Sequence, residues 1–272
     1  MPPPIVERNN VTTAGTGDRP MLFAHGFGCD QNMWRFVAPR FEDAYRIVLF
    51  DYVGAGDSAL SAYDPDRYDA LEGYARDVID VCEALDLTDV VFVGHSVSTV
   101  IGMLAATAQP DRFDELVLIG ASPCYLNDPP DYHGGFERAD LEELLEMMDK
   151  NYIGWADYFA SLLMQRAEAT EVVEELDRSF CSTDPHVARQ FAEVTFLSDY
   201  RDAVPAVPTS SLLVQCRDDI VAPPAVSRYL ETHLPDATLT MLDAAGHCPH
   251  MSHPERTTEA IEAYLSPGAR TS

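Results

Sequence analysis

Short apolar runs alternate with longer helical patterns along most of this chain, and this alternation constrains its fold more than any other feature. Strands that alternate with helices form a mostly parallel sheet that helices cover on both faces. A chain of 272 residues can bury one large core of this kind. We therefore expect an α/β fold, with strands at Met21–Ala24, Tyr45–Phe50, Val90–Val93, Leu116–Ile119, Leu212–Gln215 and Thr238–Leu242.

The segment before the third predicted strand has a helical period. Its apolar residues follow one another every three or four positions: Leu71, Tyr74, Val78, Cys82 and Leu85. This spacing predicts an amphipathic helix whose apolar face covers the sheet.

The alternation stops between about residues 127 and 205, where no convincing strand occurs. Amphipathic patterns predict four helices there, at Asp140–Lys150, Tyr152–Arg166, Thr170–Cys181 and Pro185–Ser198. Helices inserted between two strands would lie over one end of the sheet as a lid. We expect a core formed by residues 1–126 and 206–272 and a helical lid at 127–205.

Composition argues against several classes of function. The chain has 45 acidic and 18 basic residues and a formal net charge of -27, whereas nucleic-acid binding needs a basic face. No apolar run reaches the roughly 18 to 20 residues that span a bilayer, and the first residues lack a signal-peptide pattern. The six cysteines are scattered singly rather than spaced as a disulfide framework. We expect a soluble, cytoplasmic protein without nucleic-acid or membrane partners.

The most informative motif is Gly94-His95-Ser96-Val97-Ser98, which lies between the third predicted strand and a small, apolar helical segment. A strand that runs into a serine-centred turn and then a helix is the setting of a nucleophile elbow, in which the serine hydroxyl is lifted clear of the sheet. Ser96 is therefore the candidate nucleophile. The fifth position departs from the Gly-x-Ser-x-Gly pattern, because it is Ser98.

A serine hydroxyl needs a base to take its proton and a third group to orient that base. On this type of fold the expected chain order is Ser, acid, His. His247 fits the base, because it follows the last predicted strand in a loop, whereas His250 and His253 lie nearer the next helix start and are expected to be surface or capping residues. The acid follows the penultimate strand as Asp218 or Asp219, of which only one can face the imidazole.

A tetrahedral oxyanion needs two preset backbone donors. The N–H of Val97, directly after the nucleophile, is expected to be one of them. The loop His25-Gly26-Phe27-Gly28 follows the first predicted strand, and we expect the N–H of Phe27 to be the second.

Cofactor and metal sites are not indicated. His247, Cys248, His250 and His253 are close in sequence, but their spacing matches no common zinc site. The Gly54–Gly56 turn follows a strand but lacks the third glycine and the helix of a dinucleotide-binding loop. We therefore expect neither a cofactor nor a metal.

Several segments together resemble one branch of the α/β-hydrolases, the branch that contains the bacterial stress regulator RsbQ and the plant karrikin and strigolactone receptors. The resemblance extends from about residue 5 to 265, and a serine at the fifth elbow position is typical of the branch. The segments that carry it are residues 25–31 with Trp34, 51–56, 71–74, 94–98, 121–123 and 134–137.

The resemblance implies a four-helix lid over an apolar pocket and a triad of Ser96, Asp219 and His247. It therefore favours Asp219 over Asp218. The positions that match the pocket of the branch are Phe27, His95, Phe136, Trp155, Phe159 and Phe196. Each lid aromatic could equally be a packing residue.

These observations predict a serine hydrolase that acts on a small, largely apolar ester, lactone or enol-ether. Related enzymes with an aspartate nucleophile are disfavoured, because position 96 is serine. The alternative that the resemblance implies is a ligand-responsive signalling protein, similar to RsbQ. In such a protein, slow hydrolysis sets a lid state that a partner such as a phosphatase recognises.

Overall fold

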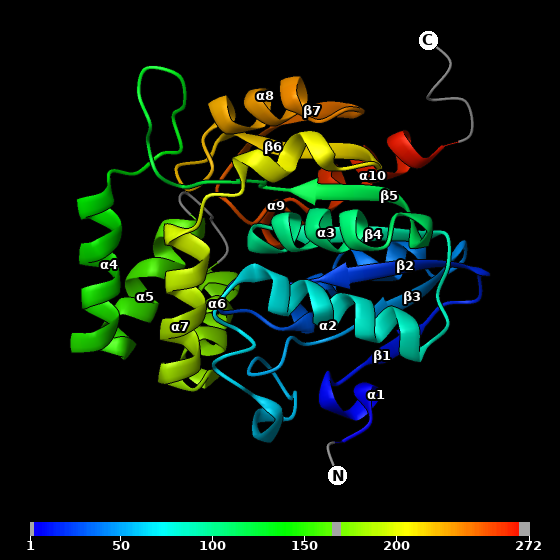
Figure 1. The fold of residues 1–272 in the computed structure, drawn as a ribbon, viewed down its shortest axis with the longest axis horizontal. Helices are drawn as coiled ribbons and strands as arrows, with labels where there is room; N and C mark the ends of the chain where they lie inside the picture. The colour runs from blue at the N-terminus through cyan, green and yellow to red at the C-terminus, as the bar shows by residue number, and fades with distance from the viewer. Residues whose placement is uncertain (1–2, 165–169, 267–272) are drawn as a thin grey trace.

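The computed structural model describes residues 3–164 and 170–266, and seven strands in these residues form one sheet (Figure 1). Their order across the sheet is β1-β3-β2-β4-β5-β6-β7. All neighbouring strands are parallel except the β1–β3 pair. The bounds are β1 Thr12–Ala14, β2 Arg19–Ala24, β3 Tyr45–Leu49, β4 Val90–His95, β5 Phe113–Ile119, β6 Ser210–Asp218 and β7 Ala237–Ala245. The predicted mostly parallel sheet is confirmed.

Strand β1 was not expected from the sequence. It has three residues, two of them exposed threonines, and it pairs antiparallel with β3 at the sheet edge. So short and polar a strand has no alternating apolar pattern, and its pairing depends on the partner strand rather than on its own side chains.

Helices cover both faces of the sheet, which explains why β4 and most of β5 are continuous apolar runs. In Figure 1, α2 (Leu71–Ala84), α3 (Val97–Ala108) and α8 (Pro224–His233) lie in front of the strands. Behind them are α9 (Pro249–Ser252) and α10 (Pro254–Leu265). The shorter helices are α1 Ile5–Arg8, η1 Gln31–Trp34, η2 Ala38–Phe41, η3 Leu60–Ala62, η4 Pro110–Arg112 and η5 Arg201–Ala206.

Four helices between β5 and β6 form a group beyond the end of the sheet where the parallel strands finish (Figure 1). They are α4 Arg138–Lys150, α5 Tyr152–Met164, α6 Thr170–Ser182 and α7 Pro185–Leu197. The four predicted helices are confirmed to within a few residues, although the expected end of the second, Arg166, lies outside the described residues. The lid boundaries at 127 and 205 stay a prediction.

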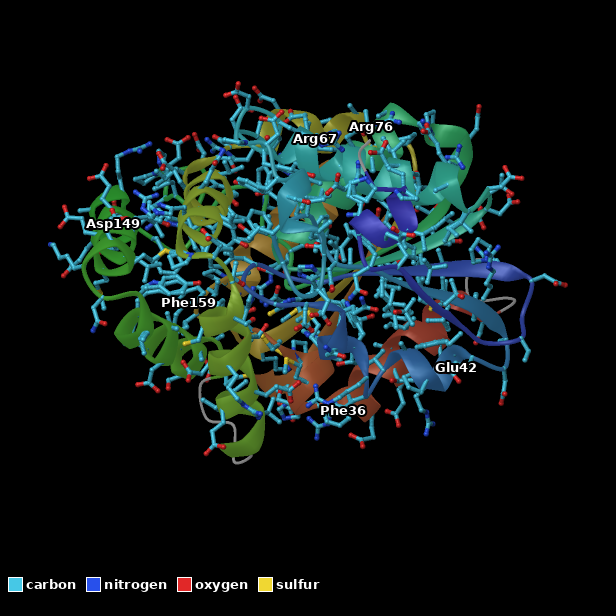
Figure 2. The ribbon with its side chains drawn as sticks, turned by 90° about the horizontal axis from the view of Figure 1, so that it is seen from below. Phe36, Glu42, Arg67, Arg76, Asp149 and Phe159 are labelled. Atoms are coloured by element: carbon cyan, nitrogen blue, oxygen red, sulfur yellow. The ribbon has the colours of Figure 1, made fainter. Side chains whose placement is uncertain are left out.

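Charged side chains such as those of Asp149 and Arg76 project from the outside of the molecule (Figure 2). Phe159 of α5 is buried, Glu42 is half-buried and Asp149 is exposed. Phe36 is an exception, because this large apolar side chain is 43% exposed. Among the helices described, none has the length and apolar character needed to span a bilayer.

Candidate active site

Ser96 occupies the sharp turn between β4 and α3. Its backbone has φ 55° and ψ -122°, a strained conformation for a residue with a side chain. Hydrogen bonds hold the turn: the Ser96 N–H donates to the Ile119 carbonyl at 2.9 Å, and Thr99 donates to the Ser96 carbonyl. Gly94 is required here because a Cβ would lie 2.8 Å from the Ser98 carbonyl oxygen. The predicted elbow geometry is therefore present.

The structure brings Ser96, His247 and Asp219 together. His247 Nε2 lies 2.8 Å from Ser96 Oγ, and His247 Nδ1 lies 2.8 Å from Asp219 Oδ2. All three side chains are buried. Because a carboxylate only accepts, Nδ1 carries the ring hydrogen, which leaves Nε2 free to accept the Ser96 hydroxyl hydrogen.

Asp219 is the carboxylate that faces the imidazole. Its oxygens also accept hydrogen bonds from the backbone N–H groups of Val221 at 2.9 Å and Ala222 at 3.0 Å, and from Gln215 Nε2 at 3.1 Å. Asp218 is exposed at the end of β6. The alternative that the residues alone left open is thus decided in favour of Asp219 as the neighbour of His247.

The backbone of His247 is held from two directions. Its N–H donates to the carbonyl of Leu163 in α5 at 2.7 Å, and its carbonyl accepts from His95 Nε2 at 2.9 Å. Gly246 precedes it with φ +95°, and a Cβ there would lie 3.0 Å from the Met164 carbonyl oxygen. The loop that carries the imidazole is therefore fastened to both β4 and the lid.

The N–H groups of Phe27 and Val97 donate to no acceptor among the described residues.

The contacts of Ser98 explain why the fifth position of the elbow is a serine. Its hydroxyl donates to the carbonyl of His25 and lies 2.8 Å from the Tyr52 hydroxyl, so it joins the elbow to the loop that carries Phe27.

Most of the predicted pocket aromatics meet in one cluster. The Phe27 ring centroid lies 6.0 Å from that of Trp155, 6.3 Å from that of Phe159 and 5.6 Å from that of Phe196. Phe180 and Phe191, which the sequence interpretation missed, also contact Phe27, at 5.9 and 5.6 Å. The rings around Phe27 come from three lid helices, α5, α6 and α7. Only the helical spacing of Phe180 within α6 and of Phe191 within α7 could have indicated these two residues.

Phe136 is not brought into this cluster. It is half-buried in the loop before α4, where its N–H donates to the Tyr125 carbonyl, and no ring contact joins it to the cluster among the described residues. Its assignment to the pocket stays a prediction.

The expectation that His250 is a surface or capping residue is wrong. Its side chain is buried between Trp34 and His95, with ring centroids 4.7 and 4.4 Å away. Burial, together with the nearby His247 and Arg35, lowers the pKa of His250 to about 3. The packing of α9 against Trp34 and His95, rather than the sequence next to Pro249, determines the surroundings of His250.

His253 begins α10, but its side chain forms no capping hydrogen bond there. Its ring is half-buried, with Nδ1 2.9 Å from Ser252 Oγ. His253 therefore occupies the expected capping position, without a hydrogen bond from its side chain. Among residues 3–164 and 170–266, no three His, Cys, Asp or Glu side chains are grouped as a metal site.

His95 lies behind the nucleophile rather than among the aromatic rings. It is buried, and burial, followed by the neighbouring His250 and His247, holds its pKa well below the usual value. A Cβ on Gly26 would lie 2.5 Å from His95 Nδ1, which explains the glycine in that loop. The neutral His95 ring supports the loop of His247 through the hydrogen bond to its carbonyl.

Tyr125 is the residue near Ser96 that the sequence interpretation missed. Its hydroxyl lies 3.2 Å from Ser96 Oγ, and its side chain is buried. It follows the end of β5, which neighbours β4 in the sheet. The sequence signal that could have indicated Tyr125 is its position on the loop after a strand adjacent to the strand of the nucleophile.

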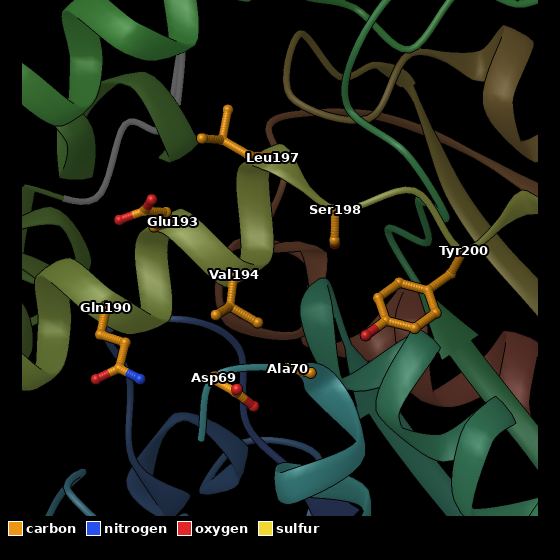
Figure 3. Close-up of a pocket in the computed structure, with 8 residues that line it drawn as sticks. All are labelled: Asp69, Ala70, Gln190, Glu193, Val194, Leu197, Ser198 and Tyr200. Atoms are coloured by element: carbon orange, nitrogen blue, oxygen red, sulfur yellow. The ribbon is translucent and has the colours of Figure 1, made fainter. Parts of the chain in front are cut away.

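A separate open pocket lies on the outside of the molecule. It has a volume of about 500 Å³ and lies between the start of α2 and the end of α7 (Figure 3). Its lining consists of Asp69, Ala70, Gln190, Glu193, Val194, Leu197, Ser198 and Tyr200. None of these is a predicted site residue, so this pocket is distinct from the surroundings of Ser96.

Comparison with known proteins agrees with this geometry. Residues 21–260 match the alpha/beta hydrolase family. The chain is 40% identical to a probable esterase of Oryza sativa subsp. japonica, over 92% of this chain and 93% of the relative, and 38% identical to the karrikin insensitive 2 receptor CA of Petunia hybrida, over 92% and 93%. A hydrolase from Oleispira antarctica has a similar structure, with a TM-score of 0.94 and 47% identity over 96% of this chain and 95% of that chain. The chain therefore belongs to the α/β-hydrolase family, in the branch of the karrikin and strigolactone receptors.

Proposed function

We propose that this protein hydrolyses a small, largely apolar ester, lactone or enol-ether, with Ser96 as nucleophile, His247 as base and Asp219 as the orienting acid. The observation that carries the proposal is the continuous pair of 2.8 Å contacts from Asp219 through His247 to Ser96. Such a chain of hydrogen bonds is what a serine nucleophile needs in order to lose its proton during attack.

In this mechanism Ser96 Oγ adds to the substrate carbonyl while His247 Nε2 accepts the hydroxyl proton. Asp219 stabilises the imidazolium, and the N–H groups of Phe27 and Val97 donate to the oxyanion. His247 then returns the proton to the leaving-group oxygen. Water next attacks the acyl carbon while His247 Nε2 accepts its proton, and the bond between the acyl carbon and Ser96 Oγ breaks as His247 returns that proton to Oγ. No cofactor is required for this chemistry.

The surroundings support an uncharged substrate. Phe27, Trp155, Phe159 and Phe196 are nearly fully buried aromatic residues in mutual contact, and a protein of net charge -27 repels anions. One relative is named an esterase and another a receptor, and both names fit a small-molecule ligand. Six free cysteines agree with a reducing compartment, so we place the enzyme in the cytoplasm.

The test is hydrolysis of p-nitrophenyl acetate and of a butenolide by the wild type and Ser96→Ala. We expect kcat/KM to fall by about 10³-fold or more in the variant, and intact-mass spectrometry to detect an acyl adduct only on the wild type. Ser122→Ala is the matched control, because its buried hydroxyl donates to the Cys124 carbonyl instead. Equal activity in Ser96→Ala would contradict the proposal.

A second function, ligand-responsive signalling, is favoured by the contacts between the lid and the site. The His247 N–H donates to Leu163 of α5, and Ser179 of α6 donates to the Gly28 carbonyl at 3.0 Å. Acylation of Ser96 would therefore change how the lid packs, and a partner such as a phosphatase would recognise that state. A long-lived acyl adduct with altered hydrogen exchange in α5 and α6 would support this role, whereas rapid turnover of many esters without such a change would count against it.

A further inference from the structure

Tyr125 presents the one hydroxyl group of another described side chain that is hydrogen-bonded to the proposed nucleophile. Its oxygen lies 3.2 Å from Ser96 Oγ, and its ring packs on Phe196 with centroids 5.4 Å apart. The Tyr125 carbonyl accepts from the Phe136 N–H at 3.1 Å, which fixes the loop. These contacts on the ring and the backbone therefore fix the Tyr125 hydroxyl beside Ser96 Oγ.

The direction of this hydrogen bond follows from the neighbouring contacts. His247 Nδ1 carries a hydrogen toward Asp219, so Nε2 accepts the hydroxyl hydrogen of Ser96. Ser96 Oγ is then an acceptor for Tyr125, whose O–H must be the donor. Burial raises the pKa of Tyr125 to about 12, so the phenol keeps its proton at neutral pH. Tyr125 is thus a hydrogen-bond donor and not a base.

The sheet order places Tyr125 on a definite side of Ser96. The loop of Phe27 follows β2, on one side of β4, whereas Tyr125 follows β5 and His247 follows β7, both on the other side. The carbonyl oxygen of a bound ester would point toward the Phe27 N–H. The leaving-group oxygen must point toward His247, because His247 returns the proton to it.

We propose that Tyr125 is a catalytic residue whose hydroxyl donates a hydrogen bond to the leaving-group oxygen, which adapts the site to esters and lactones with basic leaving groups. When the tetrahedral intermediate collapses, the bond between the acyl carbon and the leaving oxygen breaks, and its electron pair stays on that oxygen. The proton that neutralises this oxygen comes from His247 Nε2, and Tyr125 keeps its own. This inference rests on the proposed hydrolase function.

The benefit of such a donor depends on how much charge the leaving oxygen develops. A p-nitrophenolate is weakly basic and departs without help, whereas an alkoxide or a ring-opened lactone oxygen is strongly basic. A hydrogen bond to a charged oxygen is stronger than one to a neutral oxygen. Removal of the hydroxyl should therefore slow the substrates with basic leaving groups selectively.

The experiment compares the wild type with Tyr125→Phe on p-nitrophenyl, phenyl, trifluoroethyl and ethyl acetate. We expect the loss of kcat/KM in the variant to grow along this series, from the smallest loss with p-nitrophenyl acetate to about 10- to 100-fold with ethyl acetate. The plot of log kcat/KM against leaving-group pKa would become steeper. Tyr132→Phe is the matched control, because this buried tyrosine in the same loop donates to the Cys124 carbonyl at 2.7 Å, and its slope should equal that of the wild type.

The different failures are distinguishable. An unchanged slope in an active Tyr125→Phe, or a uniform loss across the series, would overturn the role at the leaving group and leave the hydrolase proposal intact. Wild-type turnover that does not depend on Ser96 would overturn both proposals. Thermal unfolding of the two phenylalanine variants shows whether a loss comes from misfolding, which would lower the rate with every ester equally.

Discussion

Two buried aspartates, Asp219 at the end of β6 and Asp77 in α2, have opposite surroundings. Asp219 is 4% exposed and Asp77 is 0% exposed. Asp219 accepts hydrogen bonds from uncharged backbone and amide groups and from the imidazole of His247. Asp77 contacts two guanidinium groups, Arg8 at 2.9 Å and Arg67 at 2.7 Å. Equal burial therefore accompanies different electrostatic roles.

The difference lies in where each negative charge acts. At Asp77 the arginines, with the Tyr68 hydroxyl and the Val53 N–H, balance the charge and join three separate segments to α2. Burial raises the pKa of Asp77, and Arg8 and Arg67 oppose that shift. At Asp219 the only titratable hydrogen-bond partner among the described residues is His247, so its charge acts on the proton of the proposed base. The charge of Asp77 is balanced by arginines and stabilises the fold, whereas the charge of Asp219 has no cationic side chain beside it and acts on the proposed base.

The largest expected effect is that of Asp219→Asn on catalysis. An amide can donate to His247 Nδ1, which favours the ring form that cannot accept the Ser96 proton, so kcat/KM should fall on the order of 10⁴-fold. The unfolding temperature should change little. Kinetics with p-nitrophenyl acetate would check this, with Asp218→Asn as the control of the adjacent exposed carboxylate. A loss of kcat/KM below tenfold in Asp219→Asn would contradict a catalytic role for the charge of Asp219.

Asp77→Asn should affect stability instead. It removes the negative charge between Arg8 and Arg67, and breaking a buried ion pair costs about 3 to 5 kcal/mol. The lower end applies, because both arginines also contact Asp80. Urea unfolding would measure the loss, and kcat/KM per folded molecule should not change.

Arg76 provides the matched control for the Asp77 cluster. It lies on the same face as Arg67 (Figure 2), but its side chain is 47% exposed and it pairs with Asp80 and Glu83. Arg76→Met should therefore cost below about 1 kcal/mol. Equal losses from Asp77→Asn and Arg76→Met would show that burial of the charge is unimportant there.

The sequence predicts one of these aspartates and not the other. Asp219 follows a predicted strand, and parallel strands bring their carboxyl ends to one edge, so its meeting with Ser96 and His247 could be inferred. The choice between Asp218 and Asp219 still needed the resemblance, because the turn that aims the carboxylate depends on its bonds to Val221 and Ala222. The order of elements follows from the pattern of apolar and polar residues, whereas the direction of a side chain in a turn depends on the backbone conformation of that turn, which the pattern does not specify.

Asp77 gives no such signal, because a charged residue in an amphipathic helix is normally solvated. Its partner Arg8 lies 69 residues away, in a segment with no apolar pattern. The burial of His250 has no sequence signal for the same reason, since Trp34 belongs to η1, which is distant in sequence. Contacts between polar residues far apart in sequence decide burial, and they have no periodicity that a single sequence could reveal.

The pH dependence of stability gives a smaller effect than the loss of Asp219 or of Asp77, and it has opposite signs at His250 and at Asp77. Burial holds the pKa of His250 at about 3, against about 6.5 in the unfolded chain. Between these values the unfolded state binds a proton that the folded state does not, so stability falls as the pH falls below 6.5. At pH 5 the loss relative to pH 8 should be about 2 kcal/mol from this group. Asp77 acts in the opposite sense, because burial raises its pKa and lets the folded state bind a proton first. Its neighbour Asp80 acts in the same sense as His250, because its contacts with the arginines lower its pKa.

The measurement is urea unfolding at pH 8 and pH 5 for the wild type and His250→Phe. Phenylalanine retains the ring contacts with Trp34 and His95 and removes the titrating group, so the variant should lose about 2 kcal/mol less between the two pH values. His186→Gln, at an exposed histidine of α7, should keep the wild-type dependence. Should His250→Phe show the wild-type loss, the acid sensitivity would have to arise elsewhere, with the buried His95 as the next histidine to replace, because burial lowers its pKa as well.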